Sequence, residues 1–307
     1  MNQPLISVIM NCYNGQTYLH DSIDSVLAQT YVNWEIVFWD NQSRDRSAEI
    51  VQSYADERIT YHYAPRHTPL YEARNLAIDK ASGEFFAFLD VDDWWEADKL
   101  EQQIELFGDP EVGIACSNYW IYDEQKHRRR LFREKAKPLI ETAYDLENVL
   151  ANYYVGMLTM VVRRSALETL SKRFDPRFNI IGDFDLSVRM CVRYKIAVIN
   201  KPLATYRTHS TNLSSLQSDG TVKELFLWRN EIKSLPEVKN SSGFGVFLRH
   251  LHYQSAVVYA NAKQWQSTFA LLPRLATIRE KVLVIIRLLL PRRVVTMISM
   301  CKLWVLR

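Results

Sequence analysis

Short apolar runs alternate with amphipathic segments over about the first ninety residues of the chain. The runs are rich in β-branched and aromatic residues and lack polar alternation, as in strands that are buried on both faces. Between them, apolar residues recur every three or four positions, as in helices with one buried face. The predicted strands cover residues 6–11, 34–39, 59–63 and 85–89, and the predicted helices cover 17–30, about 46–54 and 70–81. This alternation requires right-handed crossovers and a mostly parallel sheet.

The later part of the chain keeps strand and helix patterns but loses the regular alternation. The predicted elements are a helix through Leu100, Ile104 and Phe107, strands at 112–122 and 157–162, a helix over 182–194 and helices after about 216. The sequence therefore predicts an α/β fold with a mostly parallel central sheet, helices on both faces and a helical C-terminal extension. We expect a first domain over residues 1–215 and a helical region over residues 216–307.

One polar segment interrupts this pattern. Residues 124–137 read EQKHRRRLFREKAK, with no helical or strand periodicity. Their composition favours a solvated loop, and the alternative is a basic patch near an anionic acceptor.

The positive charge of the chain is concentrated at its C-terminal end. The net charge of +3 gives no reason to expect nucleic acid as a partner, yet residues 274–307 carry eight Lys or Arg against one Glu. The apolar runs in this basic tail fall short of the roughly 20 residues that cross a bilayer. An interfacial amphipathic segment on anionic lipid fits this composition. The alternative is that these helices pack on the first domain or on a second subunit, so an oligomer stays open.

Several function classes lose support from the composition. The four cysteines lie far apart without a C-x-x-C pair, which argues against zinc or a redox dithiol and favours a reducing, cytoplasmic compartment. The first ten residues lack the basic region and the long apolar run of a signal peptide. The nine glycines form neither G-x-G-x-x-G nor a P-loop, which disfavours dinucleotide and P-loop nucleotide binding.

An acidic cluster follows the most apolar strand. In GEFFAFLDVDDWW, residues 83–95, the strand ends at Asp90, Asp92 and Asp93. In an open parallel sheet the ligand site forms at the carboxyl ends of the strands. Three close carboxylates repel one another unless a cation compensates, and oxygen ligands suit Mg²⁺ or Mn²⁺ bridging to substrate phosphates. The alternative is that Asp90 ends a strand and one of the other acids caps the next helix.

The order of six segments resembles the family-2 glycosyltransferases, which have the nucleotide-binding fold known as the glycosyltransferase A fold. The segments are SVIMNCYNG, SVLAQTYVNWEIVFWDNQSRD, EARNLAI, ASGEFFAFLDVDDWW, GDFDLSVRM and YRTHSTNLS, within about residues 5–214. Six pieces in the family's order make chance placement a poor explanation. The resemblance implies a nucleotide-sugar half over about residues 1–110 and an acceptor half over about 111–215.

The resemblance also assigns residues to the nucleotide. Asn11 and Tyr13 match positions that contact the donor base, with the Tyr13 ring stacking on it. Asp40 matches the first acid of the family's D-D-x-S pattern, and Asn41 replaces the second. That acid accepts a hydrogen bond from the uracil ring, and an Asn carbonyl oxygen can accept it too, so a UDP-sugar is favoured. Arg74 matches the Arg of an A-R-N stretch, where it could neutralise the diphosphate.

The D-x-D motif of the family supplies the metal candidates. Asp90 and Asp92 match it, with Asp92 placed on the metal and Asp90 on the ribose or the metal. Asp93 is a further metal candidate. His209 matches the family's R-x-H motif, where it would touch the metal or the diphosphate; the alternative for a single His is a structural role.

The catalytic base is the second acid of the family's E-D pair, and Asp183 matches it. The preceding Glu, which orients the site in the family, is Gly182 here. The resemblance implies an inverting, metal-dependent glycosyltransferase that moves a sugar from a nucleotide-diphosphate sugar to a saccharide or lipid-linked acceptor. We expect it in cell-surface polysaccharide assembly, in the cytoplasm or at the inner face of the plasma membrane. The alternatives are a weakened nucleotide-sugar-binding assembly subunit, suggested by Gly182 and Asn41, and a metal-dependent nucleotidyltransferase.

Overall fold

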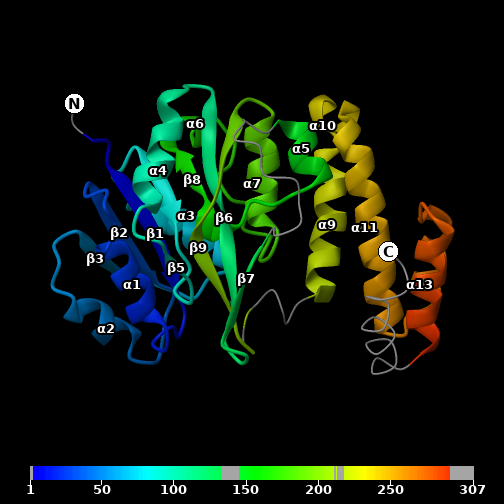
Figure 1. Cartoon of the computed structure of the whole chain (residues 1–307), viewed down its shortest axis with the longest axis horizontal. Helices are drawn as coiled ribbons and strands as arrows, with labels where there is room; N and C mark the ends of the chain where they lie inside the picture. The colour runs from blue at the N-terminus through cyan, green and yellow to red at the C-terminus, as the bar shows by residue number, and fades with distance from the viewer. Residues whose placement is uncertain (1–2, 133–144, 211, 213–217, 291–307) are drawn as a thin grey trace. The chain divides into compact units, whose positions relative to one another are not determined.

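The computed structural model (Figure 1) describes residues 3–132, 145–210, 212 and 218–290, which group into two compact units. The first unit holds the described residues up to Val149 and from Tyr153 to Asn212. The second holds Leu150–Asn152 and residues 218–290. The expected boundary after residue 215 and the tail from 291 onward lie outside the described residues.

The first unit opens with the predicted alternation of strands and helices. Its strands are β1 (Ile6–Cys12), β2 (Trp34–Asp40), β3 (Ile59–Tyr63) and β4 (Phe85–Phe88), and its helices are α1 (Leu19–Leu27), α2 (Ser47–Ser53) and α3 (Leu70–Ile78). The four strands are parallel in the order β3-β2-β1-β4. Apolar residues of α1 pack against one face of β1, α3 contacts β1 and β2, and Figure 1 shows helices on both sides of the sheet.

The rest of the first unit extends the same sheet, and its helix α5 runs on into the two residues Leu150 and Ala151 that are grouped with the second unit. The elements are β5 (Trp94–Trp95), α4 (Lys99–Glu105), β6 (Val112–Asp123), β7 (Arg128–Leu131), α5 (Leu146–Ala151), β8 (Val161–Arg163), α6 (Arg164–Leu167), α7 (Gly182–Cys191) and β9 (Lys195–Thr208). The order continues β4-β8-β6-β9-β5, in which β6 and β9 run parallel and the other pairs antiparallel. Most of the residues that pair between strands lie in parallel pairs. The prediction of an α/β fold with a mostly parallel sheet is therefore confirmed.

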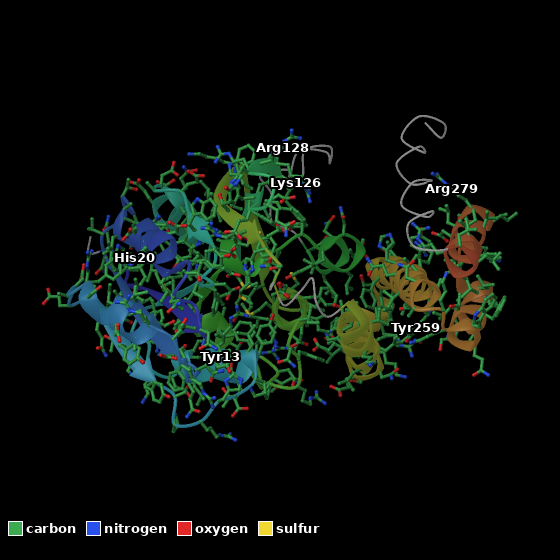
Figure 2. The ribbon with its side chains drawn as sticks, turned by 90° about the horizontal axis from the view of Figure 1, so that it is seen from below. Tyr13, His20, Lys126, Arg128, Tyr259 and Arg279 are labelled. Carbon is green, nitrogen blue, oxygen red and sulfur yellow. The ribbon has the colours of Figure 1, made fainter. Side chains whose placement is uncertain are left out.

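Two local predictions are wrong. Residues 157–162 do not form one strand, because Met157–Thr159 make a 3₁₀ turn and only β8 pairs in the sheet. The described part of the polar segment is only partly a loop: residues 124–127, which include Lys126 (Figure 2), form a turn, and β7 then pairs antiparallel with β6 in a hairpin. Exposed Arg side chains are typical of an edge strand, and the Arg129 guanidinium lies 4.4 Å from the centre of the Trp120 ring. Residues 133–137 lie outside the described residues.

The second unit is helical, which confirms the predicted helical extension. Its helices are α9 (Ser218–Ile232), α10 (Pro236–Asn240), α11 (Ser242–Asn261), α12 (Trp265–Leu271) and α13 (Ile278–Leu289). Its small core gathers Ala256, Ala260, Leu271, Leu275, Val284 and Leu288.

Helix α13 has a defined beginning and end. Thr277 and Glu280 form a capping box at its start. At its other end, the ammonium of Lys263 donates to the carbonyl oxygens of Arg287, Leu288 and Leu290 at 2.9, 3.0 and 2.6 Å. Within the described residues, no helix is both long and apolar enough to span a bilayer.

Candidate active site

The carboxyl ends of β1, β2 and β4 bring three distant parts of the sequence together. The turns after β1 and β2 place Asn14 and Gln42 in the left-handed region, with φ of 57° and 70°. The acidic loop is the segment after β4 that carries Asp90, Asp92 and Asp93. A β-carbon on Gly15 would lie 2.8 Å from the Val91 side chain in this loop, so only Gly lets the acidic loop approach β1 this closely. The fold therefore joins the expected base-binding residues and the acidic cluster at one edge of the sheet.

The residues predicted to contact the base differ in exposure. Asn11 is 9% exposed, and its amide nitrogen and oxygen have no hydrogen-bond partner in the part of the chain that the structure describes. Buried amides are normally satisfied, so this pair marks a polar position that a ligand or water would complete. Tyr13 is 54% exposed (Figure 2), and its ring centre lies 4.5 Å from that of His67. Asp40 is buried and accepts hydrogen bonds from the Ser43 N–H and the Tyr61 hydroxyl, both at 2.7 Å.

The side chain of Asn41 is hydrogen-bonded within the chain, to a residue that the sequence did not reveal as its partner. Its amide nitrogen donates to the Thr68 carbonyl at 2.8 Å, and its oxygen accepts from the Thr68 N–H at 3.1 Å and from the Thr68 hydroxyl at 3.2 Å. His67 Nδ1 lies 2.9 Å from the Asn41 carbonyl oxygen. Asn41 thus ties the loop before α3 to the end of β2, and through His67 that loop reaches Tyr13.

Each acid of the cluster has a different environment. Asp90 is half-exposed and forms an ion pair with the buried guanidinium of Arg74. Asp92 Oδ2 lies 3.0 Å from His209 Nε2 and 3.3 Å from Asn212 Nδ2. Asp93 is 1% exposed, and its Oδ1 accepts the Arg207 N–H at 2.9 Å. Burial, and then the neighbouring carboxylates, raise the pKa values of Asp92 and Asp93.

Arg207 supports the acidic loop and was not identified as a site residue from the sequence. Its guanidinium lies 4.6 Å from the centres of both the Tyr18 and Trp94 rings. It donates to the Asp92 carbonyl oxygen at 2.9 Å and pairs with Asp21. The signal was available, because Arg207 is the Arg of the R-x-H motif that pointed to His209.

The residues fit a divalent cation that is shared with a substrate. No group of three His, Cys, Asp or Glu side chains gathers at metal-binding distance within the described ranges. Asp92 and His209 form a pair, which suits an ion such as Mg²⁺ or Mn²⁺ that takes its other ligands from phosphates and water. Asp90 is held by Arg74, and the Asp93 carboxylate is buried against Arg207. Of these side chains, Asp92 and His209 are therefore the best candidates for metal ligands.

Asp183 lies at the first turn of α7. Burial raises the pKa of its carboxyl to about 6, although the Phe184 N–H, which donates to Oδ1 at 2.7 Å, and the Arg74 charge both lower it. The Tyr71 hydroxyl accepts the Asp183 backbone N–H at 3.2 Å. Asp185 is bound elsewhere, in a nearly buried ion pair with Arg189. Asp183 therefore combines a raised pKa with a position near the acidic loop, because the Arg74 charge that acts on it also pairs with Asp90.

This combination of fold and site defines a nucleotide-sugar glycosyltransferase with the glycosyltransferase A fold. A parallel nucleotide-binding half ends in clustered acids, and a mixed half contributes the partly buried Asp183 carboxyl at a helix start. The chain belongs to glycosyl transferase family 2, whose family model, described as "Glycosyl transferase family 2", matches residues 7–170. It is an enzyme that transfers a glycosyl group from a nucleotide-sugar donor.

Two relatives agree with this membership. The chain is 31% identical over 242 residues to TuaG of Bacillus subtilis, whose name assigns it to teichuronic acid biosynthesis, covering 77% of this chain and 92% of TuaG. It is 36% identical over 220 residues to WfgD of Escherichia coli, a UDP-Glc:alpha-D-GlcNAc-diphosphoundecaprenol beta-1,3-glucosyltransferase, covering 70% and 81%.

Two solved structures share the fold. The structure of S. aureus TarS in complex with UDP-GlcNAc matches with a TM-score of 0.70 and 16% identity, over 92% of this chain and 86% of that one. The mannosyltransferase PcManGT from Pyrobaculum calidifontis, in complex with GDP-Man and Mn²⁺, matches with a TM-score of 0.61 and 18% identity, over 99% and 88%.

Proposed function

We propose that this protein is an inverting, metal-dependent glycosyltransferase that uses a UDP-sugar and a saccharide or lipid-linked acceptor in cell-surface polysaccharide assembly. The observation that carries the mechanism is Asp183, a carboxyl with a pKa of about 6 beside the Arg74–Asp90 ion pair. The names of TuaG and WfgD support the pathway, and WfgD and the ligand of TarS support a UDP-sugar.

In this mechanism Asp183 takes the proton from the acceptor hydroxyl. The hydroxyl oxygen forms its bond to the anomeric carbon on the face opposite the diphosphate, while the bond to the diphosphate oxygen breaks and its electron pair leaves with UDP. A base is effective when its pKa lies near the working pH, which is the effect of burying Asp183. A bound cation would neutralise charge on the leaving diphosphate, with Asp92 and His209 as its protein ligands.

Base recognition is proposed for the carboxyl ends of β1 and β2. The exposed Tyr13 ring offers a stacking surface, Asn11 a buried amide and Asp40 a carboxylate held by Ser43 and Tyr61. Asn41 contributes through its bonds to Thr68, which keep His67 against Tyr13.

Calorimetry with UDP tests the metal assignment. We expect UDP binding to require Mn²⁺ and to be weaker in Asp92→Ala than in Asp93→Ala, because Asp92 is the more accessible acid and faces His209. Unchanged UDP affinity in the presence of a chelator would contradict metal dependence. In turnover assays, release of UDP supports glycosyl transfer, release of pyrophosphate would indicate nucleotidyl transfer, and absence of any turnover would indicate a binding subunit.

We also propose contact with an anionic membrane surface, at the cytoplasmic side, through α13. Four apolar residues of this helix are exposed and follow one another at helical spacing, namely Ile278, Val282, Ile285 and Leu289. The basic residues Arg279 and Lys281 flank the stripe on its two sides. The basic residues that the sequence places after 290 would add to this attraction.

Vesicle flotation tests the membrane proposal. Replacing Ile278 and Leu289 with Glu should abolish binding to vesicles that contain anionic lipid, since it removes apolar area and adds negative charge. Val32, an exposed apolar residue outside the second unit, provides the matched control, Val32→Glu. Equal flotation of both variants would refute the role of α13.

A further inference from the structure

The space beside Gly182 is filled by an aromatic ring from another helix. A β-carbon on Gly182 would lie 2.4 Å from Cζ and 2.5 Å from Cε2 of Tyr71, far inside van der Waals contact. No larger residue fits at position 182 while Tyr71 keeps its place. This is the position at which the E-D pair of similar glycosyltransferases has its glutamate.

The Tyr71 ring is held firmly. It comes from α3, is 3% exposed, and stacks on Phe174 with ring centres 5.1 Å apart. The Arg74 guanidinium lies 5.0 Å from its centre. Because Arg74 also binds Asp90, the ring lies between the acidic loop and the start of α7.

The Tyr71 hydroxyl binds the turn that carries Asp183. It accepts the Asp183 backbone N–H at 3.2 Å and lies 3.5 Å from the Ile180 carbonyl oxygen, to which it donates. The N–H groups of the first helical turn have no acceptor within their own helix. The hydroxyl supplies that acceptor, and so fixes the backbone from which the Asp183 side chain projects.

We infer that Tyr71 is a positioning residue that replaces the missing glutamate of the E-D pair: its ring occupies the space beside Gly182 and its hydroxyl orients Asp183 for proton abstraction. The inference rests on the proposed function of Asp183 as the base. It assigns to α3 a task that similar enzymes give to the residue next to the base.

Steady-state kinetics of the Tyr71→Phe variant test whether the Tyr71 hydroxyl positions Asp183. This variant keeps the ring and loses one hydrogen bond, so the donor site is preserved. With UDP-glucose as donor and water as acceptor, or with the most active donor of a nucleotide-sugar panel, we expect kcat to fall roughly 10- to 100-fold, the loss typical of a misplaced reacting group. The KM for the donor and the calorimetric affinity for UDP should stay unchanged.

Tyr31→Phe is the matched control. Tyr31 is also 3% exposed and its hydroxyl also binds the backbone, donating to the Pro4 carbonyl at the amino end of β1. It lies at the opposite end of the strand from the acids, so this variant should retain the wild-type kcat. A kcat loss equal to that of Tyr71→Phe would show that loss of any buried phenol hydroxyl lowers turnover, and would overturn the positioning role.

Thermal melting tests the filled space without reference to activity. We expect Gly182→Ala to lower the melting temperature by several degrees in the wild type and to have little effect in a Tyr71→Ala background, because the clash is with the ring. An equal effect in both backgrounds would refute the steric part of the inference.

Asp183→Asn separates the inference from the proposed function. If Asp183→Asn retains full turnover, the base assignment is wrong and the role of Tyr71 falls with it. If Asp183→Asn loses turnover while Tyr71→Phe retains it, the base assignment stands and the inference about Tyr71 alone is wrong.

Discussion

Asp183 faces opposite requirements in folding and in catalysis. Burial raises its pKa because a charged carboxylate loses water, and that same loss makes the carboxylate a stronger base. Its charge also raises the pKa values of Tyr71, Tyr119 and Tyr153, all of which are raised first by burial. The Arg74 charge lowers its pKa, but Arg74 also pairs with Asp90. The site therefore keeps the pKa of Asp183 at about 6, within reach of neutral pH.

Replacing Asp183 with Asn should remove most turnover and little binding. Asn has almost the same shape but cannot take a proton, so kcat should fall roughly 10²- to 10⁴-fold with UDP affinity nearly intact. Steady-state kinetics and calorimetry on the same preparation check both parts.

Asp185 provides the control for this substitution. Because its carboxylate is occupied by Arg189 in a nearly buried pair, Asp185→Asn should lower the melting temperature and affect kcat much less. A greater kcat loss in Asp185→Asn at equal folding would move the base assignment to Asp185.

The pH dependence of stability should reveal the buried carboxyl. Because its pKa is about 6 in the folded chain and ~3.9 when unperturbed, the folded state binds the proton more tightly between these values. The contribution of the Asp183 carboxyl to the free energy of unfolding is therefore lost as the pH rises from about 4 to about 6. Asp183→Asn should melt at a higher temperature than wild type at about pH 7.5, with the difference vanishing near pH 4. A less stable variant at about pH 7.5 would contradict the raised pKa.

The elements that pattern alone predicts are those whose faces are uniformly buried. Strands β1, β2 and β4 are mostly apolar and are buried along nearly their whole length, and their position implied that Asp40, Asp90 and Asp92 lie at one edge. Strand β7 escaped prediction because its Arg side chains are solvated and only its backbone pairs.

The sequence also did not show which residues of the site contact one another. Asn41 meets Thr68 and Gly182 meets Tyr71 across long sequence separations, and neither pair leaves a periodic signal.

The loop before α3 should respond to a change at Asn41. In Asn41→Asp the carboxylate keeps the acceptor but loses the donor, and it faces the Thr68 carbonyl oxygen, so the fold should lose about 1–3 kcal/mol. UDP binding should weaken because the loosened contact with Thr68 leaves the adjacent His67 ring less firmly placed against Tyr13. Chemical denaturation and calorimetry measure the two effects.

The control for this loop is Asn33→Asp. Asn33 also donates its amide to a backbone carbonyl, that of Gln3, but at an exposed position. It should cost little stability and leave UDP binding unchanged. Tighter UDP binding by Asn41→Asp would instead favour direct contact between residue 41 and the uracil ring.

At the scale of the whole molecule, each unit has its own hydrophobic core. The first is built around the sheet and the second around the small α11–α13 cluster. Units with separate cores commonly unfold as separate cooperative blocks. Function is divided in the same way, since every proposed donor, metal and base residue belongs to the first unit.

Differential scanning calorimetry should therefore show two transitions. UDP with Mn²⁺ should raise the melting temperature of one of them, because a ligand stabilises only the unit that binds it. Leu288→Ala, which opens a cavity in the second core, should lower the other. A single transition that moves in both experiments would show one cooperative block.

The contact between Gly182 and Tyr71 also constrains the order in which this site can change over generations. Acquiring a glutamate at position 182 first would force a side chain into an occupied ring, at the cost of an overpacked start to α7. Shrinking Tyr71 first leaves a hole that a side chain at position 182 can later occupy. Any mutational route to an adjacent Glu-Asp pair therefore passes through residue 71 before residue 182, and homologues that carry both a bulky ring at the first position and an acid at the second should be rare.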